Sequence, residues 1–226
     1  PFGDTLEDYR NGVELDDDLI KFFIKECEEN QIIWSSSILD MHSYEFILKY
    51  NPVLIKLPST ISNHRNFLNT IASKRVMDIV VSTGFSDKEY EDFILNKFSK
   101  VNNLFLLQCV SSYPAPPDSC QISVVRHYSE LSSTKYPHIL PGYSSHDVGA
   151  LASQLAVSAG AKMIEKHVKL GELDWIHFDG VALDLENNQF KDYVANIREA
   201  SLISGGKHKK IHESEHHKYK TNQVCN

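Results

Sequence analysis

The sequence predicts an α/β fold built on a parallel sheet, and three observations support this prediction. Six short apolar runs alternate with amphipathic stretches along the 226 residues. The runs are continuously apolar, which is typical of strands buried on both faces of a sheet. Small and polar residues follow most of the runs. This pattern fits either a doubly wound open sheet or part of a (β/α)8 TIM barrel. The sequence contains no G-x-G-x-x-G or G-x-x-x-x-G-K-[ST] motif, which weakens the nucleotide-binding alternative.

The composition is that of a globular protein. Hydrophobic residues make up 42% and charged residues 23% of the chain, which provides a core and argues against overall disorder. No apolar run approaches the length of a membrane span, and the acidic N-terminus does not resemble a signal peptide. The formal net charge of −7 argues against global attraction to nucleic acid or anionic lipid. We therefore expect neither nucleic acid nor a membrane as a partner.

The cysteines indicate a reducing compartment. Cys27, Cys109, Cys120 and Cys225 form no C-x-x-C pair, so neither a zinc ribbon nor a disulfide framework is expected. The sequence therefore predicts a cytoplasmic protein.

The first half of the chain begins with a helix over 16–29, whose apolar residues recur at helical spacing behind three aspartates. Negative charge of this kind suits a helix N-terminus. QIIWSSS at 31–37 predicts a short buried strand, and the helix over 42–50 ends before Pro52 because a residue preceding proline avoids the helical conformation. Two further strand–helix pairs follow, with strands at 53–59 and 77–84 and helices at 64–74 and 87–100.

The second half continues the alternation. The strand over 103–114 has a proline-rich exit, and a helix is expected around 120–132. The remaining strands are predicted at 138–146 and 161–168, and the remaining helices at 147–159, which is rich in small residues, and at 190–204. We expect residues 1–205 to form one partial barrel domain and the polar, basic residues 206–226 to form a flexible tail.

Polar and small residues gather where five consecutive strands end, which is the rim that carries the sites of parallel α/β folds. A serine after a strand is more often a helix N-cap than a ligand-binding residue. A joint pattern over five strands is less easily explained by caps. The residues concerned are Lys56 and Ser59; Ser82, Thr83 and Gly84; Ser111, Ser112 and Tyr113; Ser144, Ser145 and His146; and Glu165, Lys166 and His167.

Two histidines at this rim suggest a metal site. His146 and His167 end the fifth and sixth strands, and neighbouring strands lie about 4.8 Å apart. Two imidazoles at one level can share a divalent ion. The alternative is a metal-free pair, in which hydrogen bonds satisfy one histidine and the other caps a helix.

The rim also suggests an anion site. Lys56 lies among apolar residues at a strand end, so its stem is expected to be buried. Ser82, Thr83 and Gly84 offer two hydroxyls and a close backbone approach at a helix start, which suits a phosphate. The alternative is a structural lysine with several helix caps.

One motif near the C-terminus is misleading. His212 to His216 reads H-E-x-x-H, the zinc-protease pattern. The surrounding segment has almost no apolar residues to bury a helix, and no third ligand follows. A solvated tail is the better interpretation.

At this point the motifs resemble those of the sialic acid synthase (NeuB-like) family. GYSSHDVGALASQLAVSAGAKMIEKHV is similar to that family's G-Y-S-D-H-T segment followed by E-K-H-F. KLPS, VVSTG and QCVSSYPAPPDS are similar to K-I-x-S, L-S-T-G and H-C-T-S-x-Y-P-A-P, in the same order. HFDGVALDLENNQF resembles a D-x-x-A-S-L-x-P-x-x-F stretch. The resemblance runs from about residue 17 to 200.

The resemblance implies a transferase that condenses phosphoenolpyruvate with N-acetylmannosamine or a related N-acetylated amino sugar. The enolpyruvate C3 attacks the sugar aldehyde, water adds at C2, and a nonulosonic acid and phosphate are released. A divalent metal, Mn²⁺ or Mg²⁺, polarises the aldehyde. By this resemblance His146 and His167 bind the metal. Lys56, Ser59, Ser82, Ser111 and Ser144 hold phosphoenolpyruvate, and Tyr113 and Asp179 contact the sugar. Lys56, Tyr113, His146 and His167 are the expected catalytic residues, and Thr83 joins the expected substrate-binding set.

The chain departs from the family pattern in several places. The acidic residue before the first metal histidine is Ser145, and the following threonine is Asp147. Ile61 replaces an acidic residue, and Gln108 replaces a histidine. DWIHFDG at 174–180 replaces the family's P-G-P-D loop. These changes concern the sugar more than the metal and phosphate residues.

The family's first two strands, E-I-x-x-N-H-x-G and K-x-Q, and its C-terminal antifreeze-like domain are not recognised in the chain. We therefore expect about six of the eight strand–helix units of a barrel. If the barrel is incomplete, we expect this chain alone to be inactive. One alternative is a non-catalytic sugar- or phosphate-binding homologue that lost two strands. Another is a different phosphoenolpyruvate-dependent synthase of keto sugar acids. Dimers are common in the family, so a homodimer is compatible with the resemblance.

Overall fold

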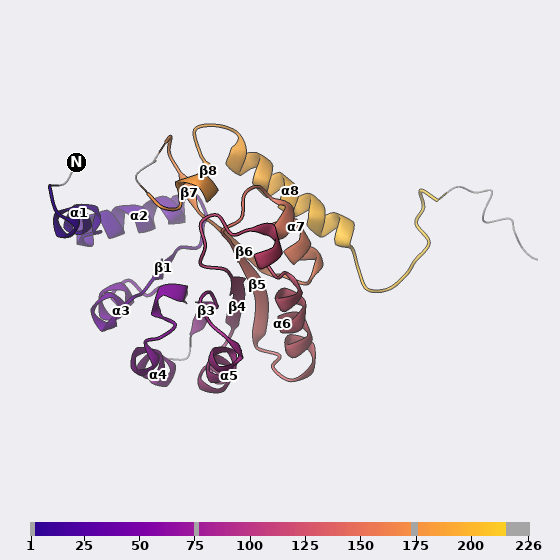
Figure 1. Cartoon of the computed structure of the whole chain (residues 1–226), viewed down its shortest axis with the longest axis horizontal. Coiled ribbons are helices and arrows are strands. Elements are labelled where there is room, and N and C mark those ends of the chain that lie inside the picture. The colour runs from indigo at the N-terminus through magenta and orange to yellow at the C-terminus, as the bar shows by residue number, and fades with distance from the viewer. Residues whose placement is uncertain (1–2, 75–76, 173–175, 216–226) are drawn as a thin grey trace, which may run out of the picture.

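The computed structural model describes residues 3–74, 77–172 and 176–215. Its main element is a curled six-stranded parallel sheet in the order β1-β2-β3-β4-β5-β6, with helices packed along its outer side (Figure 1). A doubly wound sheet reverses its strand order at a switch point, whereas here every strand pairs with the next along the chain. The order therefore favours the barrel-type alternative. The strands are β1 (Ser35–Ser37), β2 (Leu54–Leu57), β3 (Asp78–Ser82), β4 (Leu104–Cys109), β5 (Ile139–Ser145) and β6 (Met163–Lys166).

Seven helices agree with the sequence prediction to within a few residues. They are α2 (Asp17–Glu29), α3 (Met41–Leu48), α4 (Arg65–Lys74), α5 (Lys88–Lys97), α6 (Ser123–Thr134), α7 (Leu151–Ser158) and α8 (Gln189–Ser204). None of the helices within the described residues combines the length and apolarity needed to cross a lipid bilayer. Six consecutive strand units are thus present in the described part of the chain, and the expected total of eight stays a prediction.

The predicted strand over 31–37 is wrong in its first half. Ile32 and Ile33 are 61% and 71% exposed, and the Ile32 amide donates to the Cys27 carbonyl at 2.8 Å. These residues therefore unwind from the end of α2 instead of pairing with β2, and β1 is only three residues long. The exposure of Ile32 and Ile33 leaves an apolar surface beside an edge strand.

The structure also contains short elements that the sequence does not predict. Helix α1 (Leu6–Val13) begins with a capping box, in which the Asp8 amide donates to Thr5 Oγ1 at 3.1 Å. The predicted strand over 161–168 splits at His167, because β7 (Val168–Lys169) leaves the main sheet and pairs in parallel with β8 (Leu183–Asp184). His167 therefore occupies the bend between two sheets.

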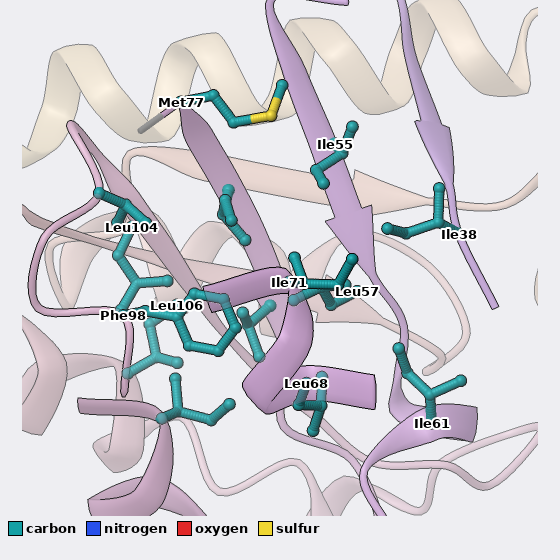
Figure 2. Close-up of a cluster of buried hydrophobic side chains, with 14 of the residues drawn as sticks. Ile38, Ile55, Leu57, Ile61, Leu68, Ile71, Met77, Phe98, Leu104 and Leu106 are labelled. Atoms are coloured by element: carbon teal, nitrogen blue, oxygen red, sulfur yellow. The ribbon is translucent and has the colours of Figure 1, made fainter. Parts of the chain in front are cut away.

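The main core lies between the outer face of the sheet and the surrounding helices. Alternate strand residues such as Ile55, Leu57, Ile79 and Leu106 are 0–1% exposed and belong to one cluster with Leu68 and Phe98 (Figure 2). Because strand side chains alternate between faces, the residues between them, including Lys56 and Ser82, point to the concave side. Because the apolar residues pack outward against the helices, the polar residues that alternate with them face the concave side of the sheet.

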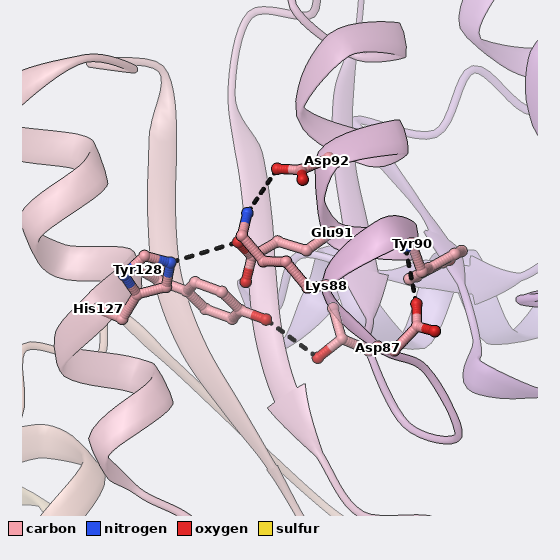
Figure 3. A network of polar contacts seen from close by, with 8 residues as sticks. Asp87, Lys88, Tyr90, Glu91, Asp92, His127 and Tyr128 are labelled. Carbon is pink, nitrogen blue, oxygen red and sulfur yellow. Dashed lines mark hydrogen bonds and ion pairs between the residues drawn. The ribbon is translucent and has the colours of Figure 1, made fainter.

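A polar network joins α5 to α6 on the outer side of the sheet (Figure 3). Glu91 is 8% exposed; it accepts from Lys88 Nζ at 2.8 Å and lies 3.3 Å from His127 Nε2. The Tyr128 hydroxyl donates to Thr83 Oγ1 at 3.3 Å. The network therefore ties both helices to the end of β3.

Candidate functional site

A cavity of about 550 Å³ opens at the carboxyl ends of the strands. Its walls come from segments that are far apart in the sequence, since each strand contributes the residue at its end. Eight of the ten predicted site residues line it: Lys56, Ser59, Ser82, Ser111, Tyr113, Ser144, His146 and His167.

Thr83 and Asp179, the other two, do not line this cavity. The Thr83 hydroxyl donates to the Leu107 carbonyl at 2.9 Å, so it faces the outer side of the sheet, where its hydrogen bonds are structural. Lys169 Nζ donates to the Asp179 carboxylate at 2.6 Å. Asp179 therefore serves the loop beside β7 in this structure.

Lys56 is paired within the cavity. Its ammonium contacts the Glu165 carboxylate, and the Ser144 hydroxyl donates to the same carboxylate at 2.9 Å. The side chains of Lys56 and Glu165 are 17% and 32% exposed, so the pair is partly desolvated and stronger than a surface pair. Glu165 was among the polar strand-end residues but had no assigned role, because its sequence position does not reveal that it meets a lysine from β2.

Two serines that line the cavity, Ser59 and Ser111, pack around Gly84. Its amide donates to Ser59 Oγ at 2.9 Å, and a Cβ added at Gly84 would lie 2.4 Å from Ser111 Oγ and 2.6 Å from Ser59 Oγ. A side chain at position 84 would therefore force both serine side chains to move.

Ser82 carries an unused hydroxyl in the same region. It is 2% exposed, and its Oγ is buried with no hydrogen-bond partner among the described residues. Leaving a buried polar group unpaired costs about 1–3 kcal/mol. A ligand oxygen bound in the cavity would remove this cost.

The two predicted metal-binding histidines lie side by side. Their ring centroids are 5.3 Å apart. His146 Nδ1 lies 2.7 Å from the Val110 carbonyl oxygen, which can only accept, so Nδ1 carries the proton. His146 Nε2 consequently keeps its lone pair, the arrangement found in metal-binding histidines.

The surroundings of both imidazoles favour the neutral form. Burial lowers the pKa of His146. Burial, followed by the neighbouring His146, lowers the pKa of His167 to about 4. Neutral imidazole is the form that binds metal. Two such rings fit a divalent ion as a pair, although the described residues contain no group of three His, Cys, Asp or Glu side chains placed to hold one. The other ligands would be water, substrate oxygens or groups beyond the described residues.

Aromatic rings surround this pair. Tyr113 packs against His146 with centroids 4.2 Å apart and meets the edge of His177 at 4.8 Å. Phe178 stacks on His167 at 4.5 Å with ring planes 10° apart. His177 also lines the cavity. The sequence predicts no role for His177, because the segment 174–180 has no strand or helix periodicity. Asp174 and Trp175 of that segment lie outside the described residues.

The H-E-x-x-H segment lies in the tail. His212, Glu213 and Glu215 are exposed, and the Glu215 amide donates to the His212 carbonyl at 3.0 Å in a turn. His216 and Cys225 lie outside the described residues. None of the described tail residues lines the cavity.

Comparisons with known proteins agree with this architecture. A model of the NeuB family matches residues 3–209. The chain is 28% identical over 211 residues to N-acetylneuraminate-9-phosphate synthase of Homo sapiens, covering 93% of this chain and 57% of that protein. It is 30% identical over 188 residues to pseudaminic acid synthase of Campylobacter jejuni, covering 81% and 52%.

A crystal structure of N-acetylneuraminic acid (sialic acid) synthetase from Leptospira borgpetersenii superposes with a TM-score of 0.81 at 19% identity. The superposition covers 99% of this chain and 77% of that one. At this identity the likeness concerns the fold alone. The chain spans about half the length of the curated relatives it matches.

Proposed function

The chain belongs to the NeuB family, and from this premise we propose that it carries the reaction centre of a synthase that makes a sialic or other nonulosonic acid. The reaction joins C3 of phosphoenolpyruvate to the aldehyde carbon of N-acetylmannosamine or a related amino sugar. Water adds at C2, and inorganic phosphate leaves. Named synthases of such acids among the relatives support this class of reaction.

One observation carries the proposal: a single cavity holds a lysine, several serine hydroxyls and a pair of imidazoles whose pKa values are lowered by burial. Lys56, Ser59 and Ser82 would bind the phosphate and carboxylate of phosphoenolpyruvate, with the unpaired Ser82 hydroxyl as a donor. A bound anion would share the Lys56 ammonium with Glu165. The ion pair thus orients the lysine before the ligand arrives.

The imidazole side would receive the sugar. His146 and His167 would hold Mn²⁺ or Mg²⁺, which as a Lewis acid would polarise the sugar aldehyde. Tyr113 lies against His146, and burial raises the pKa of its hydroxyl. The hydroxyl therefore stays protonated and would donate a hydrogen bond to an oxygen of the sugar. The surrounding rings of His177 and Phe178 would exclude water from this part of the cavity.

The test is phosphate release by the full chain incubated with Mn²⁺, phosphoenolpyruvate and N-acetylmannosamine or its phosphorylated form. We expect release only when both substrates are present, with a product mass equal to the two substrates plus water minus phosphate. Binding of phosphoenolpyruvate, detected by calorimetry, without phosphate release under any of these conditions would contradict the synthase proposal and favour the non-catalytic alternative.

The histidine pair provides the matched variants. His146→Ala and His167→Ala should each lower phosphate release by about 100-fold or more, because the metal loses a ligand. His42→Ala is the control, since His42 is exposed on α3. Wild-type rates in either rim variant would rule out the proposed metal site.

A further inference from the structure

The strand ends that carry His146 and His167 present different chemistry on their two faces. Ser144 pairs with Glu165 across β5 and β6, and Ser145 pairs with Lys166. Paired residues share a face and successive residues alternate. Ser144 and Glu165 line the cavity, so Ser145 and Lys166 lie on the outer side of the sheet, directly behind the histidines.

On this outer side a single ammonium group bridges the two strand ends. Lys166 Nζ donates to Ser145 Oγ at 2.9 Å and to the Asp147 backbone carbonyl at 2.5 Å. Ser145 and Asp147 flank His146, whereas Lys166 immediately precedes His167. We propose that Lys166 is a positioning residue that holds the imidazoles of His146 and His167 at the spacing needed to share one divalent ion.

A buried carboxylate keeps this bridge in place. Asp147 Oδ1 accepts from Ser145 Oγ at 2.7 Å and from the Tyr143 hydroxyl at 2.9 Å. Asp147 is 6% exposed, Ser145 0% and Tyr143 1%. A charge in such surroundings is costly unless an opposite charge lies nearby. The Asp147 carboxylate therefore balances the Lys166 ammonium, and the Ser145 hydroxyl, which donates to one and accepts from the other, has a fixed orientation.

Two helices close this arrangement from behind. The Lys166 ammonium lies 5.9 Å from the centre of the Tyr193 ring of α8, and the Tyr193 hydroxyl is 2.6 Å from Ser153 Oγ of α7. Ser153 is 0% and Tyr193 6% exposed. Lys166 itself is half-buried, so these two helices shield part of its side chain from solvent.

The need for such a bridge follows from the geometry of the site. His146 immediately follows β5, and His167 lies at the bend where β6 gives way to β7. The main-chain hydrogen bonds of the sheet stop at this level, since Ser145 and Lys166 form the last pair. By bonding to the Asp147 carbonyl, the Lys166 side chain extends the connection two residues beyond this pair on the β5 side. This inference rests on the proposed function, because it concerns the metal pair of that site.

The experiment compares Lys166→Met with Lys162→Met in the full chain. Methionine keeps the apolar stem and removes the ammonium, and Lys162 is an exposed lysine near the start of the same strand. Mn²⁺ binding, followed by the electron paramagnetic resonance signal of the free ion, should weaken by about 10- to 100-fold in K166M, as for other residues that support metal ligands. K162M should bind as the wild type does. Lys166→Arg, which keeps the charge, should recover part of the affinity.

A metal-free readout separates this inference from the proposed function. Crystal structures of wild type and K166M should show the ring-centroid distance of His146 and His167 lengthened from 5.3 Å in the variant. An unchanged distance, or Mn²⁺ affinity within twofold of wild type, would overturn the positioning role. If the wild type binds no Mn²⁺, the metal proposal fails and the ring distance alone decides. If K166M does not fold, Ser145→Ala, which removes one bond of the bridge, is compared in the same two ways.

Discussion

At the scale of single residues, Gly84 leaves no room for a side chain beside two serines that line the cavity. A Cβ there would lie 2.4 Å from Ser111 Oγ and 2.6 Å from Ser59 Oγ. We expect Gly84→Ala to weaken phosphoenolpyruvate binding by about tenfold or more and to lower the free energy of unfolding by about 1–3 kcal/mol, because both serines must move. Calorimetry and denaturant titration measure the two effects. Gly206→Ala, with nothing within 4 Å of the added Cβ, is the control. Equal phosphoenolpyruvate affinity and equal stability of the two variants would contradict the role given to Gly84.

His138 predicts a pH dependence that is independent of the proposed metal site. Burial lowers its pKa from the ordinary value of 6.5, and its Nε2 is buried without a partner among the described residues. The unfolded chain therefore takes up a proton at higher pH than the folded one. Stability from this residue is complete above about pH 7 and is lost as the pH falls through the lowered folded value.

We therefore expect His138→Asn to reduce the pH dependence of the thermal unfolding midpoint between about pH 7.5 and pH 5, while His146 and His167, whose pKa values are also lowered, maintain the rest of the slope. Asparagine cannot be protonated in this range. His208→Asn, at an exposed position in the tail, should leave the wild-type slope unchanged. A wild-type slope in His138→Asn would show that His138 is not the source.

At the scale of elements, the N-terminus of α5 offers a direct test of helix capping. The Asp87 carboxylate accepts from the Tyr90 amide at 3.1 Å (Figure 3). We expect Asp87→Ala to destabilise the protein by about 1 kcal/mol, measured by denaturant unfolding, and Asp87→Ser to restore most of the loss because serine also caps helices. An alanine variant as stable as the serine variant would mean that tertiary packing alone holds α5.

The elements also show what the sequence can and cannot predict. Strands buried on both faces were recognisable, because their apolar runs are continuous. The predicted beginning of β1 is wrong: the pattern predicts Ile32 and Ile33 to be buried in a strand, but they lie in the turn that follows α2 and are exposed. A run of apolar residues does not reveal whether a neighbouring strand covers it.

The same reasoning applies to the candidate site. Strand ends and strand alternation brought most of the predicted residues into one cavity. Thr83 was misplaced because the strand ends at Ser82 and the next hydroxyl turns outward to Leu107. The partnership of Glu165 with Lys56 joins residues that are 109 positions apart, and the approach of His177 to Tyr113 depends on a loop without periodicity. Neither contact leaves a local signal in the sequence.

At the scale of the whole molecule, the sheet has two free edges within the described residues, at β1 and β6. Beside β1 lie exposed apolar side chains, with Ile32 at 61%, Ile33 at 71% and Val53 at 60%. Unpaired edge strands with apolar neighbours promote association between chains, and a lysine on the edge opposes it.

The 226-residue chain should therefore associate as its concentration rises, measured by light scattering after gel filtration. Ile33→Lys should shift the chain toward the monomer, whereas Leu202→Lys, at a residue 83% exposed near the end of α8, should not. A chain that stays monomeric at every concentration would show that this edge is already protected, and equal association of the two variants would place the contact elsewhere on the surface.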